Sequence, residues 1–296
     1  MPENRNAFRS HPDLYMASSL PDAIAALAQR GERGQALAGG TWIMRAPVRG
    51  EAQDRDYVGL SRIDTLRELR RSDTALAIGA CVTHAQLARE LPADPAWEAL
   101  ALAAAKSANP AVRNTATLGG NLCAASFAAA DLVPALMCLD ATVEVEGTGG
   151  AERIGVEAFV ERREAFVPGT LVTGVTIDRD AARRRISTHA RLPLRRAGDY
   201  PVAIVSMSAQ IGDDGKVLDA RIAVGSVEAV PRRWTAMEET MAGRPLDDAG
   251  LAAKARLASA AFTGRDGVEA PGWYRVRVLP VLFERAIAQL RQGAGR

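Results

Sequence analysis

The 296-residue sequence is poor in the residues that build most metal and disulfide sites. It has three cysteines and three histidines, and the cysteines, Cys81, Cys123 and Cys138, are widely spaced with no C-x-x-C motif. An odd number at such spacing argues against a disulfide framework and against an iron–sulfur or zinc site within the chain. No two histidines have metal-ligand spacing, so no metal site is expected, and the cysteines are predicted to be buried apolar residues.

Long apolar runs and blocks of like charge are also missing. No run approaches the roughly 18 residues of a membrane-spanning helix, and residues 1–16 lack the apolar core of a secretory signal. The net charge is +2, with 37 basic residues scattered among 35 acidic ones, which does not favour nucleic acid as a partner. We therefore expect a cytoplasmic chain with no membrane span.

Hydrophobic periodicity predicts mixed helices and strands, with the charge run at 179–185 as the best domain boundary. A strand-then-helix set follows that run and suits a small α+β domain. A helix is expected to be interrupted at Pro134, and Thr83 is expected to cap a helix that begins near His84. The expected helices cover 19–30, 83–91, 96–108 and 278–292, and the expected strands cover 35–38, 56–60, 75–80, 141–147, 169–177, 201–211 and 215–227.

Two adjacent glycine pairs interrupt this pattern, in "ALAGGTWI" at 36–43 and in "TATLGGNLCAASFAAAD" at 115–131. A glycine pair permits positive φ and close approach, and successive exposed N–H groups can bind an anion such as a pyrophosphate. Two ordinary tight turns are the alternative. Neither pair matches the P-loop or the dinucleotide motif G-x-G-x-x-G. Two such loops about 80 residues apart suit a dinucleotide held between two lobes.

The glycine segments and three others together resemble one family. "ALAGGTWIM", "IGACVTHAQLA", "SANPAVRNTATLGGNLCAAS", "ADLVPALMCLDATVEV" and "WYRVRVLPVLFERAI" are similar, in order, to the FAD-binding medium subunit of the molybdenum hydroxylases, the xanthine dehydrogenase and carbon monoxide dehydrogenase family. The resemblance implies an α+β fold in two parts. Residues 1–180 would form a two-lobed FAD-binding domain of the vanillyl-alcohol oxidase type, and residues 186–296 a small α+β domain of the CO dehydrogenase flavoprotein type.

The resemblance also implies the residues that bind FAD. The first glycine segment would wrap the pyrophosphate, the second would lie near pyrophosphate and ribityl chain, and Asp131 would hold a hydroxyl-bearing part of the cofactor. Val172 and Arg191 would lie near the flavin or adenine. The full set implied is Ala36, Leu37, Ala38, Gly39, Gly40, Thr41, Trp42, Ile43, Ala108, Thr117, Leu118, Gly119, Gly120, Asn121, Asp131, Val172 and Arg191.

The chain departs from the family pattern at several of these positions. Trp42 stands where the family often has Asp, and Phe127 replaces a Pro in the segment after the second glycine pair. That segment also has one extra residue before Asp131, and Arg191 replaces the more usual Lys.

The function implied is that of an electron-transfer subunit. FAD, bound non-covalently, would take electrons from [2Fe-2S] clusters in a small partner subunit and pass them to an external acceptor, while a large partner subunit carries the molybdenum cofactor. The chain would be an oxidoreductase subunit without catalytic acid or base residues, since the redox chemistry belongs to the cofactor. One alternative is a self-sufficient flavin oxidase of the same fold that acts directly on a small alcohol or phenol. Another is a flavin-free module that scaffolds the other two subunits, although the intact "AGGT" and "TLGGN" argue against it.

Overall fold

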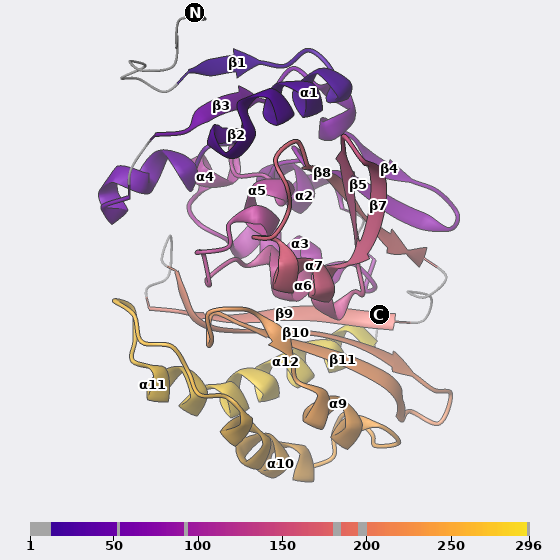
Figure 1. Ribbon diagram of the computed structural model, residues 1–296. Helices are drawn as coiled ribbons and strands as arrows, with labels where there is room; N and C mark the ends of the chain where they lie inside the picture. The colour runs from indigo at the N-terminus through magenta and orange to yellow at the C-terminus, as the bar shows by residue number, and fades with distance from the viewer. Residues whose placement is uncertain (1–12, 52–53, 92–93, 180–184, 195–199, 295–296) are drawn as a thin grey trace, which may run out of the picture.

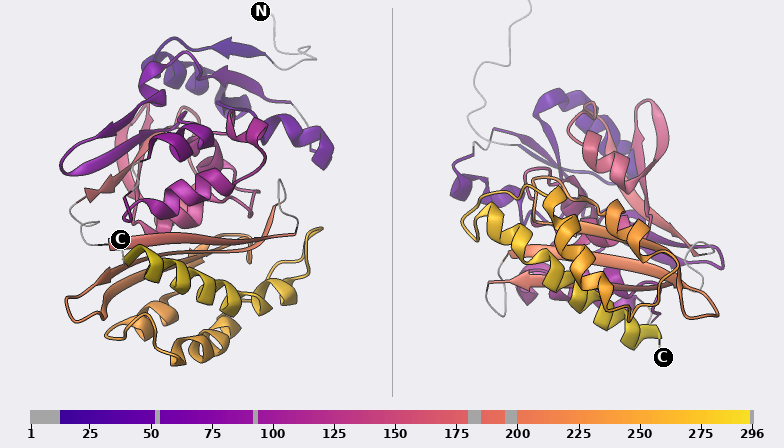
Figure 2. Two further views of the ribbon diagram at one scale, coloured as in Figure 1. Left: turned by 180° about the vertical axis from the view of Figure 1, so that it is seen from behind. Right: turned by 90° about the horizontal axis from the view of Figure 1, so that it is seen from below.

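The computed structural model describes residues 13–51, 54–91, 94–179, 185–194 and 200–294. Its elements lie in three tiers, an N-terminal tier, a middle tier and a C-terminal tier, as seen from the front and from behind (Figures 1 and 2). The predicted boundary at 179–185 falls largely outside the described residues.

The N-terminal tier is a three-stranded parallel sheet of order β1-β3-β2, covered by α1. Helix α1 forms as the sequence predicts. Ser19 caps its first turn by accepting a hydrogen bond from the Asp22 N–H, and Gly31 ends it with φ of 57°. The elements are β1 (Leu14–Met16), α1 (Leu20–Arg30), η1 (Gly31–Arg33), β2 (Gly34–Leu37), η2 (Ile43–Arg49), β3 (Asp56–Gly59) and η3 (Asp64–Arg67).

The middle tier is a five-stranded antiparallel sheet of order β4-β5-β8-β6-β7 with short helices packed on it. Strands β4 and β5 form an antiparallel hairpin. The elements are β4 (Leu69–Arg71), β5 (Ala75–Gly79), α2 (His84–Glu90), α3 (Glu98–Lys106), α4 (Pro110–Arg113), α5 (Leu118–Cys123), α6 (Leu132–Cys138), β6 (Thr142–Gly147), β7 (Gly150–Gly155), α7 (Val156–Arg162) and β8 (Leu171–Asp178).

The C-terminal tier is a four-stranded antiparallel sheet of order β12-β11-β10-β9. One face carries α9, α10 and α12, and the other faces α3 and α6 of the middle tier (Figure 1). Both faces are covered, which explains why the first nine residues of β10 are all buried. The elements are β9 (Arg185–Pro193), β10 (Pro201–Ile211), β11 (Val217–Gly225), β12 (Arg232–Arg233), α9 (Thr235–Met241), α10 (Gly250–Ala258), η4 (Ser259–Ala261), α11 (Gly272–Arg277) and α12 (Leu279–Ala294).

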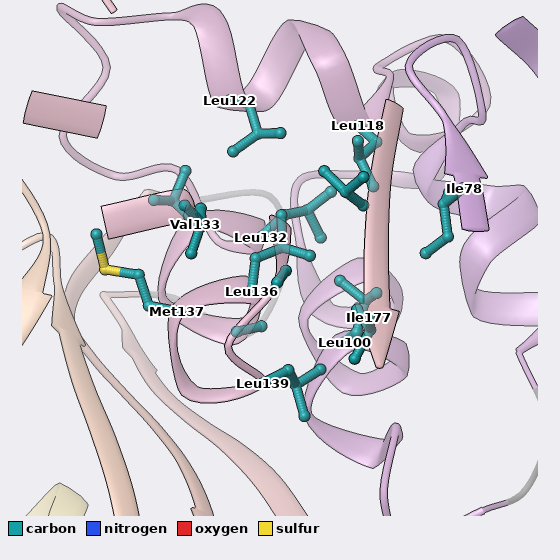
Figure 3. Close-up of a cluster of buried hydrophobic side chains, with 14 of the residues drawn as sticks. Ile78, Leu100, Leu118, Leu122, Leu132, Val133, Leu136, Met137, Leu139 and Ile177 are labelled. Carbon is teal, nitrogen blue, oxygen red and sulfur yellow. The ribbon is translucent and has the colours of Figure 1, made fainter. Parts of the chain in front are cut away.

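Helix α6 packs against α3 and α5 of the middle tier and against β10 and β11 of the C-terminal sheet. Its predicted interruption at Pro134 is wrong. Pro134 is the third residue of the helix, in the first turn, where a backbone N–H has no partner within the helix and the proline ring is tolerated. The helix is therefore continuous from Leu132 to Cys138, and all seven of its residues are buried. Leu132, Val133, Leu136 and Met137 belong to the core cluster shown in Figure 3, together with Leu118 of α5.

Candidate functional site

A cavity of about 910 Å³ opens among the three tiers. Its wall is built from the first glycine segment, from residues 107–131 and from Arg191 and Tyr200 of the C-terminal tier, with Val172 of β8. The volume lies at the upper end of the range for ligand and cofactor sites, roughly 300–1,000 Å³. The two glycine segments that the sequence singles out therefore meet at one cavity.

The first glycine segment leaves β2 as an open turn. Gly40 has φ of 66°, which only glycine adopts readily, as the sequence analysis expects. The backbone N–H groups of Gly39, Gly40, Thr41 and Trp42 donate to no other described residue. Four successive free donors on a cavity wall form an anion-binding concavity.

Gly39 has a different role. A Cβ at this position would lie 1.8 Å from the carbonyl oxygen of Thr115, so the absence of a side chain lets the two glycine segments pack together.

The second glycine pair is helical, which the sequence pattern does not predict. Thr117 caps α5 and accepts a hydrogen bond from the Gly120 N–H at 3.1 Å, while the Gly119 N–H donates to the Ala80 carbonyl at 2.8 Å. Neither glycine has positive φ. The prediction that this pair also exposes N–H donors for an anion is wrong, because these donors are already used within the protein.

Most of the residues implied by the resemblance line the cavity, and two do not. Leu118 points into the core and is fully buried, and Leu37 lies behind the first segment, next to Gly40. The residues that do line the cavity are Ala36, Ala38, Gly39, Gly40, Thr41, Trp42, Ile43, Ala108, Thr117, Gly119, Gly120, Asn121, Asp131, Val172 and Arg191.

Ala108 occupies an unusual backbone conformation at the wall. Its φ is 44°, which non-glycine residues rarely adopt, and the carbonyl groups of Ser107 and Ala108 accept hydrogen bonds from Arg113 Nη1 at 3.0 and 2.7 Å. Strain of this kind costs about 1–3 kcal/mol and clusters at ligand sites.

A buried ionic cluster joins the middle and C-terminal tiers beside the cavity. Asp131 Oδ1 accepts a hydrogen bond from Arg191 Nε at 2.9 Å and lies 3.4 Å from His189 Nε2. Both residues come from β9, whereas Asp131 is the N-cap residue directly before α6. Burial lowers the pKa of His189, which favours its neutral form despite the neighbouring carboxylate. The C-terminal tier therefore completes the site.

His84 also lies in the wall, although the sequence pattern predicts for it only a place at a helix start. That structural prediction is confirmed, because Thr83 accepts a hydrogen bond from the Gln86 N–H and α2 begins at His84. The ring is buried, with Nδ1 2.7 Å from Ser107 Oγ. The motif "VTHAQL" lies inside the resemblance, and this was the only sequence signal for His84.

Three aromatic rings close one side of the cavity. Trp42 and Phe127 have ring centroids 4.5 Å apart, and Phe127 and Tyr200 5.0 Å apart. The Arg49 guanidinium lies 3.9 Å from the Trp42 ring centroid, and Arg45 Nη1 donates to the Tyr200 hydroxyl at 3.1 Å. Trp42 and Phe127 are two of the departures from the family pattern, and the structure shows that they contact each other.

The prediction that the cysteines are buried is confirmed for two of the three. Cys81 and Cys138 are buried, and burial raises their thiol pKa values to about 11 and about 12. Cys123 is exposed and lines the cavity, because it ends the short α5 at the wall.

Across the described ranges, no group of three or more His, Cys, Asp and Glu side chains is arranged to hold a metal ion. No helix in the described part of the chain is long and apolar enough to cross a membrane.

The residues at the wall fit an extended ligand such as FAD. The free N–H groups of residues 39–42 suit its pyrophosphate, and the buried carboxylate of Asp131 suits a hydroxyl-bearing part. Gly120 is exposed at the wall, where a Cβ would meet only Thr117 Oγ1, at 3.0 Å, so the backbone there is open to close approach.

Comparison with known proteins also indicates an FAD-binding chain. A family model described as the FAD binding domain in molybdopterin dehydrogenase matches residues 6–179, and one described as the CO dehydrogenase flavoprotein C-terminal domain matches residues 189–290. The chain is 28% identical over 286 residues to subunit alpha of the 6-hydroxypseudooxynicotine dehydrogenase complex of Paenarthrobacter nicotinovorans, covering 94% of this chain and 93% of that one.

Two further comparisons involve carbon monoxide dehydrogenase. The medium chain of the enzyme from Afipia carboxidovorans is 28% identical over 291 residues, which is 95% of this chain and 97% of that chain. The structure of reconstituted CO dehydrogenase from Oligotropha carboxidovorans superposes with a TM-score of 0.84 at 23% identity, covering 97% of this chain and 99% of that chain. The resemblance and the predicted fold class are confirmed. The chain belongs to the family of FAD-binding medium subunits of molybdenum hydroxylases, as an oxidoreductase subunit whose cofactor is FAD.

Proposed function

We propose that this chain is the electron-transfer subunit of a molybdenum hydroxylase. It takes electrons from [2Fe-2S] clusters of a small partner subunit and delivers them to an external acceptor, while a large partner subunit holds the molybdenum cofactor and oxidises the substrate. The complex is cytoplasmic. The observation that carries the proposal is that both glycine segments and the C-terminal tier line the same cavity.

The chain's own residues bind and orient the cofactor. The N–H groups of residues 39–42 hold the pyrophosphate, and Gly120 leaves room for close backbone approach. Asp131, held by Arg191, accepts hydrogen bonds from the hydroxyl-bearing part. The Trp42, Phe127 and Tyr200 rings exclude water from one side of the cavity. When bound, FAD supplies the redox chemistry, and the protein sets its position and surroundings.

We also propose that FAD is bound non-covalently and that the domains cover residues 1–180 and 186–296. Acid precipitation of the purified chain is expected to release yellow FAD into the supernatant. Flavin that stays on the pellet, or FMN alone in the supernatant, would contradict this binding mode.

The experiment that tests the function uses the flavin-loaded chain with and without partners. Dithionite is expected to bleach the flavin absorbance of the isolated chain, whereas a heterocycle, aldehyde or phenol offered alone is not. Adding the two partner subunits, purified from the native host, is expected to restore bleaching by substrate. Rapid bleaching by an organic substrate without partners would instead support the self-sufficient oxidase.

A further inference from the structure

His84 has one ring nitrogen with a partner and one without. It is 3% exposed and lines the cavity. Nδ1 lies 2.7 Å from Ser107 Oγ, whereas Nε2 has no hydrogen-bond partner in the described part of the chain. Buried polar atoms in folded proteins almost always have a partner, so this nitrogen requires an explanation.

The surrounding hydrogen bonds assign the tautomer of His84. Ser107 Oγ also lies 2.9 Å from the carbonyl oxygen of Ala104, which can only accept, so the single hydroxyl proton of Ser107 points there. Ser107 Oγ must then accept from His84 Nδ1–H. The other tautomer would leave Nδ1 unprotonated opposite Ser107 Oγ, whose single proton already points to Ala104, so two acceptors would face each other at 2.7 Å. Nε2 therefore carries a lone pair.

The ring stays neutral at physiological pH. Burial lowers the pKa of His84 to about 4, and the nearby Asp131 carboxylate and Thr117 carbonyl oppose the shift without overcoming it, while the Arg113 charge adds to it. His84 is thus a neutral residue of the cavity wall, with an acceptor at Nε2 and no positive charge.

Asp131 provides a second acceptor in the same wall. Its Oδ1 is taken by Arg191, and none of the described residues donates a hydrogen bond to its Oδ2. A phosphate group, which only accepts at neutral pH, cannot satisfy either atom, whereas hydroxyl groups can satisfy both. The chemistry of this part of the wall therefore selects a hydroxylated segment of the ligand.

We propose that His84 positions bound FAD by accepting, at Nε2, a hydrogen bond from one of its hydroxyl groups. The inference rests on the proposed placement of FAD in this cavity. FAD carries hydroxyl groups in two places, the ribityl chain and the ribose of its adenosine half. FMN contains only the first and ADP only the second.

Two substitutions separate the ligand contact from the structural one. In His84→Asn the amide nitrogen replaces Nδ1 and can still donate to Ser107, but nothing remains at the position of Nε2. In His84→Gln an acceptor remains near the position of Nε2, while the Ser107 bond is lost. The dissociation constants of FAD, FMN and ADP for the flavin-free full-length chain are measured by calorimetry, together with the melting temperature of each variant.

His84→Asn is expected to weaken FAD binding about 3- to 10-fold, the effect of one hydrogen bond, and His84→Gln to weaken it less. A parallel loss for FMN assigns the contact to the ribityl chain, and one for ADP assigns it to the ribose. Unchanged FAD affinity in a folded His84→Asn variant overturns the inference. A wild-type chain that binds no FAD overturns the proposed function instead.

A measurement on the wild-type chain covers the case in which these variants do not fold. With ¹⁵N-labelled histidine, the unprotonated Nε2 of His84 is expected to shift upfield when FAD is added, because its lone pair accepts a hydrogen bond. Saturation with FAD without any change in this resonance would overturn the inference.

Discussion

Replacing Gly39 by Ala is expected to destabilise the folded chain itself, whether or not a cofactor is bound. The new Cβ would lie 1.8 Å from the Thr115 carbonyl oxygen and 2.7 Å from its carbon, so both backbones must move to restore normal contact. Overpacking of this kind costs about 1–3 kcal/mol, and the lower entropy of the unfolded alanine chain offsets about 0.4–1 kcal/mol. The net loss of about 1–2 kcal/mol corresponds to a melting temperature lower by roughly 2–8 °C.

Gly120→Ala is the matched control, because it changes the same residue type on the same cavity. Its Cβ would meet only Thr117 Oγ1, at 3.0 Å, and alanine is favoured over glycine within a helix by about 0.5–1 kcal/mol. The flavin-free melting temperature of Gly120→Ala is expected to equal or slightly exceed that of the wild type, while its FAD affinity falls. Differential scanning calorimetry and FAD titration measure both quantities. A flavin-free Gly39→Ala chain that melts like the wild type would refute the contact between the two segments.

Three further predictions follow from the other contacts at the cavity. Phe127→Ala removes the ring contact with Trp42 and is expected to lower the free energy of unfolding by about 2–4 kcal/mol in urea titrations; a loss below 0.5 kcal/mol would contradict its role in packing. Asp131→Asn leaves the Arg191 guanidinium buried without its carboxylate and is expected to cost about 3 kcal/mol in the same assay, whereas Asp213→Asn, in an exposed turn, is not expected to change stability. Because the pKa of His84 is about 4 when folded and 6.5 ordinarily, the unfolded chain binds more protons between these values. The contribution of neutral His84 to the free energy of unfolding is therefore complete above about pH 6.5 and is lost as the pH falls towards 4. His84→Asn is expected to reduce the change of the urea unfolding midpoint with pH over this window.

The local elements were predictable where the signal lies within a few neighbouring residues. The Ser19 cap, Pro21 in the first turn and Gly31 define α1. The alternation of apolar and polar residues over 142–147 defines β6, in which Val143 and Val145 are buried. Pro134 was misjudged because its effect depends on its position within the helix, and α6 begins only two residues before it. The second glycine pair was misjudged because Thr117 and the backbone of Ala80 supply partners that make it helical.

The site was predictable in outline for a different reason. The glycine segments carry a specific order of small residues, and this order identifies the family and most of the residues at the wall. It does not reveal which glycine serves which purpose, because Gly39 and Thr115 are 76 residues apart and their contact exists only after folding. The pairing of Trp42 with Phe127 and the reach of Arg191 to Asp131 are likewise contacts between distant segments.

The sequence by itself determined the family, the cofactor class and the elements built from local signals, because these depend on neighbouring residues and on motif order. Only the tertiary structure decided that one glycine segment keeps free N–H donors while the other uses its own in α5. Only the tertiary structure also made His84 an acceptor, since its tautomer depends on Ser107, 23 residues away, and its neutrality depends on burial. Hydrogen-bond partners and burial are properties of the packed chain, and no local pattern encodes them.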